Sequence, residues 1–238
     1  MTPTEAVVQG SEAKRGCFIT LEGGDGAGKT TQARRLASTL ASMGLPVLRT
    51  REPGGAPTAE EIRKLLLSRA DWDAQTQLWL HFAARREHVV KTILPALRAG
   101  MWVVCDRFLD STFAYQGAAQ GSSWGLIADV ALASLEGLSP DLTLVLDVDP
   151  QTAALRTQSR GDTNHYDTKQ LDFRERVREG FLAISRQFPE RCVLIDASAG
   201  EDSVERRILG HLCEVLASNF GPISAPMAEL TGAHPQAA

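Results

Sequence analysis

A glycine-rich stretch from Gly23 to Thr30 carries the clearest chemistry in the sequence. It reads G-G-D-G-A-G-K-T, fits G-x-x-x-x-G-K-[ST], and lies between an apolar run and a segment with helical periodicity. Glycines in such a loop let backbone N–H groups point at a phosphate, and the start of the next helix adds positive potential. The predicted donor-site residues are Gly23, Gly24, Asp25, Gly26, Ala27, Gly28, Lys29 and Thr30.

Two residues of this loop suggest the bound cofactors. The lysine of the motif, Lys29, reaches the β- and γ-phosphates of a nucleotide, and the hydroxyl of Thr30 ligates Mg²⁺. The loop therefore predicts ATP or GTP with Mg²⁺. A GTP-dependent switch would carry an N-K-x-D motif, which the sequence lacks. We therefore favour ATP.

An acid inside a phosphate loop, Asp25, needs an explanation, because a carboxylate repels the polyanion beside it. Its backbone N–H can face the donor phosphates while its side chain points elsewhere. We expect the carboxylate to point across the loop toward a second substrate.

Two further segments predict a second phosphate site. T-R-E-P-G-G (50–55) and C-D-R-F-L-D-S-T-F-A-Y-Q-G (105–117) each follow or end an apolar, strand-like run. Carboxyl ends of parallel strands meet at one edge of a sheet, so Arg51 and Arg107 should lie near the glycine-rich loop. Guanidinium groups match phosphate oxygens in two contacts. A donor and an acceptor phosphate site together indicate a phosphotransferase.

With these segments the sequence resembles the thymidylate kinase family, from about Cys17 to Leu216. Bacterial members carry an acid in the P-loop, an R-E-P-G-G segment, a D-R-[YFH]-x-x-S-x-x-A-Y-Q-G segment and a lid with arginines. The resemblance implies transfer of the γ-phosphoryl group of ATP to dTMP in dTTP synthesis, and a homodimer. It also implies that Asp25 lies against the deoxyribose 3′-OH or the Mg²⁺ shell.

The resemblance assigns roles around the acceptor. Arg51 and Arg107 would hold the dTMP phosphate, and Asp106 would orient Arg107 or join Thr30 at Mg²⁺. The residues that would line the acceptor pocket are Ser111, Thr112, Tyr115 and Gln116, with Tyr115 leaving little room for a ribose 2′-OH.

Base recognition in the family uses F-x-x-x-R, and this chain departs from it. In H-F-A-A-R-R-E-H (81–88), aligning the downstream P-A-L makes Arg85 the base reader and puts His81 at the aromatic position. Aligning on Phe82 would instead make Arg86 the reader. We expect Arg85 to read the base and Phe82 to stack on it, with His81 as the alternative.

The resemblance also implies a polar lid at about 155–170. Arg156 and Arg160 match its arginines, and Gly26 occupies a position where other branches of the family have a P-loop arginine. The catalytic residues would then be Asp25, Lys29, Arg107, Arg156 and Arg160.

The pattern of the whole chain indicates an α/β protein with the three-layer P-loop NTPase fold. Apolar runs at 17–22, 46–50, 101–106, 142–148 and 192–197 predict a five-stranded parallel sheet flanked by helices. Helices are expected after the glycine-rich loop, from about 58, and at 74–98, 123–136, 150–158, 171–187 and 202–218, with Pro95 bending or ending the third. The kinase domain would span 16–218, between a disordered tail at 1–15 and a flexible one at 219–238.

Composition limits the partners and the compartment. The net charge is −4, no apolar run approaches roughly 18 residues, and the four cysteines form no C-x-x-C pair. We expect a cytoplasmic protein without a nucleic-acid or membrane partner. Two alternatives remain: another deoxynucleoside or nucleotide kinase, and a P-loop ATPase switch. Deoxynucleoside kinases commonly have a Glu before D-R, where this chain has Cys105.

Overall fold

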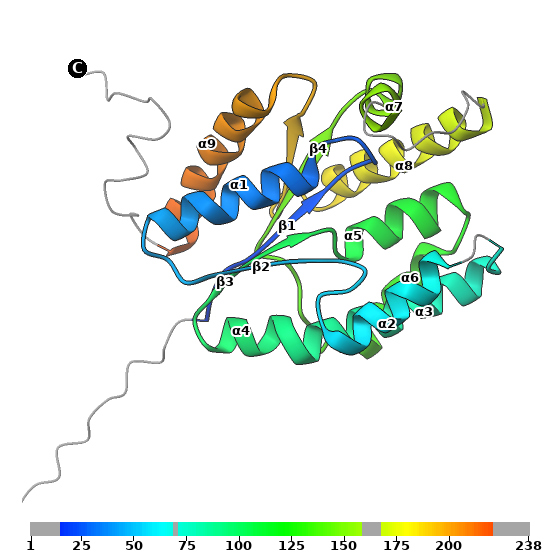
Figure 1. Ribbon diagram of the computed structural model, residues 1–238, viewed down its shortest axis with the longest axis horizontal. Helices are drawn as coiled ribbons and strands as arrows, with labels where there is room; N and C mark the ends of the chain where they lie inside the picture. Colours follow the sequence, from blue (N-terminus) through cyan, green and yellow to red (C-terminus); the bar gives the residue numbers. More distant parts are fainter. Residues whose placement is uncertain (1–14, 69–70, 159–167, 221–238) are drawn as a thin grey trace, which may run out of the picture.

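The computed structural model describes residues 15–68, 71–158 and 168–220, which contain one parallel sheet of five strands (Figure 1). The strand order is β2-β3-β1-β4-β5. The strands are β1 (Phe18–Glu22), β2 (Val47–Arg51), β3 (Trp102–Asp106), β4 (Leu142–Asp147) and β5 (Cys192–Asp196). The predicted α/β class and five-stranded parallel sheet are confirmed.

Helices cover both faces of the sheet, which makes three layers. Figure 1 shows α1 (Lys29–Ser42) and α9 (Glu201–Phe220) on one face, and α3 (Ala74–His88), α4 (Leu94–Arg98) and α6 (Trp124–Ser134) on the other. Strand side chains alternate between the faces. Ile19 and Leu21 therefore pack with α1 and α9, whereas Phe18 packs with α3 and α6.

Of the remaining helices, three follow the carboxyl ends of β2, β3 and β4, and the fourth packs against β4 and β5. They are α2 (Pro57–Leu67), α5 (Leu109–Thr112), α7 (Pro150–Gln158) and α8 (Thr168–Gln187). Two π-helical segments, η1 (Val89–Ile93) and η2 (Phe113–Ala119), were not predicted. Pro95 has no N–H to donate to the preceding turn. The π-helical turn η1 directly precedes it, and α4 continues the helix beyond it. The helix therefore does not end at Pro95.

The strand order places the two predicted phosphate-binding segments side by side. β1 pairs with β3 on one side and with β4 on the other, and Leu21 lies opposite Asp106. The glycine-rich loop after β1 therefore lies beside Arg107, which directly follows β3. Strands β2 and β3 lie on one side of β1, and β4 and β5 lie on the other. In parallel sheets the connections then leave in opposite directions at this point, which creates the crevice where such sheets bind ligands.

The predicted tails fall largely outside the described residues. Helix α9 continues to Phe220, two residues into the segment 219–238 that we expected to be a tail. Among the described residues, no helix combines the length and apolar character needed to cross a membrane. Cys17, Cys105 and Cys192 are buried and unpaired.

Candidate active site

The glycine-rich loop connects β1 to α1 and packs closely against α7. Gly26 has a φ of 88°, a conformation that side chains disfavour. A β-carbon at Gly26 would lie 2.3 Å from the carbonyl oxygen of Ala153. The backbone approach to α7 therefore leaves no room for a side chain at this position, and the supply of arginine by the lid stays a prediction.

Lys29 and Thr30 begin α1 and face the loop. Lys29 Nζ donates to the carbonyl oxygen of Gly24 (2.7 Å), and burial, together with nearby Arg107, lowers the pKa of Lys29 to about 7. The Thr30 hydroxyl donates to Asp106 Oδ2 (2.5 Å). This brings the two predicted metal ligands together. A phosphate group beside Lys29 would stabilise its charged form.

The Thr30–Asp106 pair fits a magnesium ion. Mg²⁺ prefers oxygen ligands and is commonly held by one or two protein oxygens together with substrate phosphates and water. The described residues contain no cluster of three or more His, Cys, Asp or Glu side chains that could hold a metal. A metal here would therefore rely on the nucleotide for its remaining ligands.

Arg107 joins the glycine-rich loop to the acceptor side. Its Nη2 forms an ion pair with Asp25 and donates to the Tyr115 hydroxyl (3.1 Å), while Nη1 donates to the Gly23 carbonyl oxygen (3.2 Å) and to Ser111 Oγ (3.1 Å). The carboxylate of Asp25 thus points toward Arg107. The Arg107 and Lys29 charges outweigh the opposing effect of burial and hold the pKa of Asp25 below its ordinary value.

Glu22 fixes the backbone around Arg107 and was not predicted as a site residue. Arg107 has a φ of 73°, a left-handed conformation that costs a non-glycine residue about 1–2 kcal/mol. Buried Glu22 accepts from the next backbone N–H, that of Phe108 (2.7 Å), and from Ser111 Oγ (2.6 Å). Burial and the charge of Asp110 raise the pKa of Glu22 to about 8. These contacts hold the strained turn in place.

A cavity of about 340 Å³ lies beside Arg107, and most of the predicted acceptor residues line it. The predicted lining residues are Asp25, Arg85, Arg107, Ser111, Thr112, Tyr115 and Gln116. Phe173, which reaches the cavity from α8, was missed. Its ring lies 6.2 Å from that of Tyr115 at an interplanar angle of 62°.

Arg85 has one guanidinium nitrogen left for a ligand. Nε donates to Glu52 Oε2 (2.7 Å), and Nη2 donates to the Phe108 carbonyl oxygen (3.1 Å) and to Thr112 Oγ1 (2.9 Å). Nη1 is buried and has no hydrogen-bond partner among the described residues. Arg86, the alternative reader, instead donates to the Ser134 carbonyl oxygen and does not line the cavity. The geometry favours Arg85.

Phe82 does not line this cavity, contrary to our expectation, and His81 does. Phe82 is buried in the core with Phe108 and Ile127, and the Arg85 guanidinium lies 5.2 Å from its ring centroid. His81 precedes Arg85 by four residues, so the two share a helix face. Burial, with the Arg85 charge, lowers the pKa of His81 to about 4, which leaves a neutral ring.

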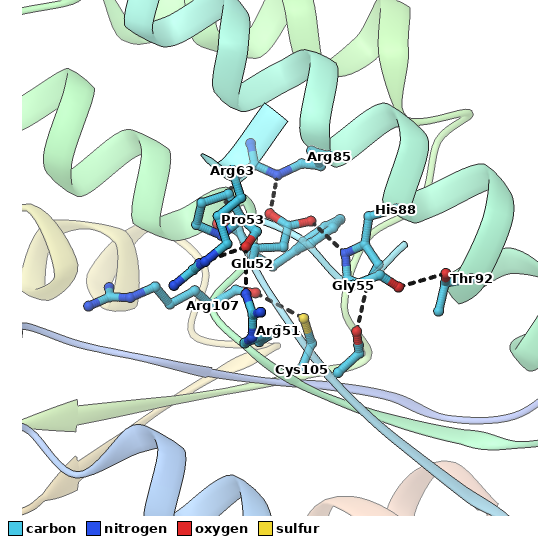
Figure 2. A network of polar contacts seen from close by, with 12 residues as sticks. Arg51, Glu52, Pro53, Gly55, Arg63, Arg85, His88, Thr92, Cys105 and Arg107 are labelled. Atoms are coloured by element: carbon cyan, nitrogen blue, oxygen red, sulfur yellow. Dashed lines mark hydrogen bonds and ion pairs between the residues drawn. The ribbon is translucent and has the colours of Figure 1, made fainter. Parts of the chain in front are cut away.

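Arg51 lies near the acceptor region but outside the cavity lining. It donates to the Pro53 carbonyl oxygen (2.9 Å) and pairs with Glu60 Oε2 (3.0 Å). Arg63, which was not predicted, donates to the same carbonyl (2.7 Å). Figure 2 shows Arg51, Arg63 and Arg107 around Pro53. Burial and then the charge of Arg51 lower the pKa of Arg63, with Arg107 adding to the effect, so positive charge is concentrated here.

Arg156, one of the two predicted lid arginines, lies in the last turn of α7. It lines a cavity of about 250 Å³ with Gly26, Gln32 and Gly200, on the donor side of the glycine-rich loop. Its guanidinium donates to the carbonyl oxygens of Ala197 (2.9 Å) and Ser198 (2.8 Å). Arg107 does not line this cavity. Arg160 and most of the predicted lid fall outside the described residues.

Comparison with known proteins gives the family. The thymidylate kinase family model matches residues 21–208. The chain is 47% identical to a thymidylate kinase of Caulobacter vibrioides over 196 residues, which cover 82% of this chain and 94% of that protein. It is 45% identical to one from Chromohalobacter salexigens, covering 85% of this chain and 98% of that protein. The chain belongs to the thymidylate kinase family.

A solved structure supports the same assignment. The crystal structure of thymidylate kinase from Ehrlichia chaffeensis superposes with a TM-score of 0.71 at 35% sequence identity. It covers 83% of this chain and 99% of that one. The family fold therefore extends over most of the chain.

Replacing Glu22 with Gln should change how stability depends on pH. The pKa of Glu22 is raised to about 8, so its favourable contribution is fully present below the unfolded value near 4.5 and is lost as the pH rises toward 8. We expect the free energy of unfolding in urea to fall less steeply between pH 5 and 8 in Glu22→Gln than in the wild type. Parallel pH profiles would contradict the raised pKa of Glu22.

Proposed function

We propose that the glycine-rich loop and the acceptor cavity together transfer the γ-phosphoryl group of ATP to dTMP, giving dTDP and ADP. This is the activity of the family to which the chain belongs, and it makes the chain an ATP-dependent nucleoside monophosphate kinase of nucleotide biosynthesis. One observation carries the placement of the site: Arg107, in the wall of the acceptor cavity, pairs with Asp25 inside the donor loop.

The reaction at this site needs positioning and positive charge. The attacking group is a phosphate oxygen of dTMP, and a phosphomonoester with a second pKa near 6 is mostly dianionic at neutral pH. It therefore needs no general base. Arg107, Lys29 and Arg51 would hold the two substrates in line and neutralise their charge, and Arg63 would add to this field. Buried Lys29 in the loop and half-buried Arg63 beside Pro53 support this role.

Mg²⁺ completes the proposed donor site. Thr30 and Asp106, whose side chains are already in contact, would hold it. When bound, the ion would neutralise charge on the phosphate oxygens of ATP. Arg156, at the donor-side cavity, would contact the nucleotide there, and Arg160 remains the candidate for the charge that the lid brings to the transferred group.

The acceptor cavity supports selection of a thymine deoxynucleotide. Nη1 of Arg85 would donate to the O4 atom of thymine, whereas cytosine presents an amino donor there and would be rejected. His81 takes the place that we had given to Phe82 and would stack on the base. Tyr115 would restrict the space near the sugar 2′ position, and Ser111, Thr112 and Gln116 complete the wall.

A homodimer and a cytoplasmic location complete the proposal. Exposed apolar side chains lie on three helices of one side of the molecule: Leu65 and Leu67 on α2, Trp79 on α3 and Leu132 on α6. Helix α3 contacts both α2 and α6. Such a surface suits an interface between two copies. The substrates ATP and dTMP and the unpaired cysteines are those expected in the cytoplasm.

Removing the Arg107 side chain should mainly impair the use of dTMP. Glycine is the preferred replacement because it tolerates the φ of 73° at this position. We expect Arg107→Gly to lower kcat/KM for dTMP by roughly 100-fold or more, equivalent to about 3 kcal/mol, with a smaller change in KM for ATP. Release of ADP is measured in a coupled assay, and Arg34→Ala, at an exposed arginine on α1, is the control.

The same assay separates the alternative functions. dTMP, dUMP, dCMP, dGMP and thymidine are offered in turn, and dTMP should give the highest kcat/KM. Equal ADP release with and without a monophosphate would indicate an ATPase switch, and a preference for thymidine would indicate a nucleoside kinase. Unchanged activity in Arg107→Gly would contradict the role given to Arg107.

His81 and Phe82 are separated by substituting each one. We expect His81→Phe to lower KM for dTMP about threefold, because a larger apolar ring would stack on the base. Phe82→Leu should lower the free energy of unfolding by about 1 kcal/mol while KM for dTMP changes less than about twofold. An increase in KM for dTMP confined to Phe82→Leu would return the stacking role to Phe82.

The proposed dimer surface is tested at Trp79, which is 41% exposed on α3. A charge buried without a partner strongly opposes association. We therefore expect Trp79→Glu to sediment as a monomer at concentrations where the wild type is a dimer. Leu194→Glu changes a similarly exposed side chain (46%) on β5 and should leave the dimer intact. A wild-type protein that sediments as a monomer would contradict the proposal.

A further inference from the structure

A buried polar network connects the end of β2 to α3, and the proposed mechanism does not use all of it. Glu52 accepts from Arg85 Nε at Oε2 (2.7 Å), and its Oε1 lies 3.1 Å from His88 Nδ1. The other ring nitrogen of His88, Nε2, lies 2.7 Å from Thr50 Oγ1. Figure 2 shows Glu52 between Arg85 and His88. The chain of contacts therefore runs from Thr50 through His88 and Glu52 to Arg85.

Every member of this network is tied to its neighbours. The side chains of Arg85, Glu52 and His88 are 3%, 4% and 0% exposed. Burial alone would raise the pKa of Glu52, but Arg85 and His88 outweigh it and hold that pKa below its ordinary value. Glu52 is therefore a carboxylate that can only accept, and His88 Nδ1 must carry a proton. In a neutral ring, Nε2 then accepts from the Thr50 hydroxyl.

The network determines the orientation of the Arg85 guanidinium. Arg85 and His88 are three residues apart on α3 and share a helix face, while Glu52 comes from the segment after β2. Glu52 accepts a hydrogen bond from Nε, and Nη1 is the guanidinium nitrogen that has no partner in the described residues. Glu52 itself is held by His88. If His88 did not donate, Oε1 of a buried carboxylate would be unsatisfied and Glu52 would shift toward another donor.

We propose that His88 is a positioning residue that acts through Glu52 to hold Arg85 in its base-reading orientation, so that selection among pyrimidine nucleotides depends on a histidine outside the acceptor cavity. The inference rests on the proposed role of Arg85. His88 is absent from the cavity lining, whereas Glu52 and Arg85 are both part of it. His88 therefore reaches the nucleotide only through them.

A second contact between the same two regions offers a control. Thr92, four residues after His88, donates to the Gly55 carbonyl oxygen (2.8 Å) and so also ties the helix to the 52–55 segment. Thr92 makes no hydrogen bond to Glu52 or Arg85. Replacing it with valine keeps the shape and removes this tie. If His88 served only to anchor the segment, Thr92→Val would have the same effect as a His88 variant.

The test compares two polar replacements of His88 in the full-length protein. Asn places its amide near the position of Nδ1, where it can still donate to Glu52, whereas Gln places its amide near Nε2, where it can reach only Thr50. The measured quantity is the ratio of kcat/KM for dTMP to kcat/KM for dCMP. Arg85→Met provides the reference for complete loss of base reading.

We expect His88→Gln to lower the selectivity ratio about tenfold, mainly through KM for dTMP, with KM for ATP unchanged. His88→Asn should restore most of the wild-type ratio, and Thr92→Val should leave the ratio unchanged. This pattern would support the inference, because a purely structural role would not distinguish the two amides.

Three outcomes would overturn it. Wild-type selectivity in His88→Gln, together with loss in Arg85→Met, would remove His88 from the mechanism and leave the proposed role of Arg85 intact. An equal loss in Thr92→Val and His88→Gln would show that His88 only anchors the segment. Wild-type selectivity in Arg85→Met would overturn both the inference and the base-reading role.

Discussion

The ion pair between Arg107 and Asp25 is the contact on which the rest of the site depends. It joins the loop that precedes α1 to the segment that follows β3, two parts of the chain separated by 82 residues. Arg107 adopts a left-handed backbone conformation to make it, and buried Glu22 stabilises that turn through the next backbone N–H. Because Glu22 also ends β1, one short stretch of chain sets both the donor loop and the acceptor arginine.

The sheet order and the helices around the cavity keep the glycine-rich loop and the segment after β3 together. With β1 between β3 and β4, the glycine-rich loop lies beside the residues of the D-R-F segment. The η2 segment then directs Tyr115 and Gln116 toward the same cavity, and α8 supplies Phe173 to its wall. Positive charge is concentrated where two anionic substrates must meet. Phosphoryl transfer mainly requires that the two substrates are aligned and that their negative charge is neutralised. A kinase with this arrangement therefore needs no general base.

The sequence predicted the features that short stretches determine. The apolar runs place all five strands within one or two residues, and the glycine spacing identifies the donor loop. Features that depend on distant contacts were missed. Glu22 supports the site because the backbone N–H of Phe108, 86 residues away, donates to it. His88 contacts the site because Glu52, which comes from another element, lies against its ring. Phe82 and His81 both lie one helical turn before Arg85, and tertiary packing decides between them: Phe82 is buried against Phe108 and Ile127, whereas His81 lines the cavity. The hydrogen bonds of Arg156 to the carbonyl oxygens of residues 197 and 198 likewise have no sequence signal, because they depend on how α7 packs against that segment.

The central claim is that the acid of the donor loop serves the acceptor, and isothermal titration calorimetry of Asp25→Asn tests it most directly. Binding of dTMP and of a non-hydrolysable ATP analogue is measured separately, with the wild type alongside. The Asp25–Arg107 pair orients the acceptor arginine, so the Kd for dTMP should rise by roughly tenfold and the Kd for the ATP analogue by less than about threefold. A larger loss for the ATP analogue than for dTMP would contradict the account.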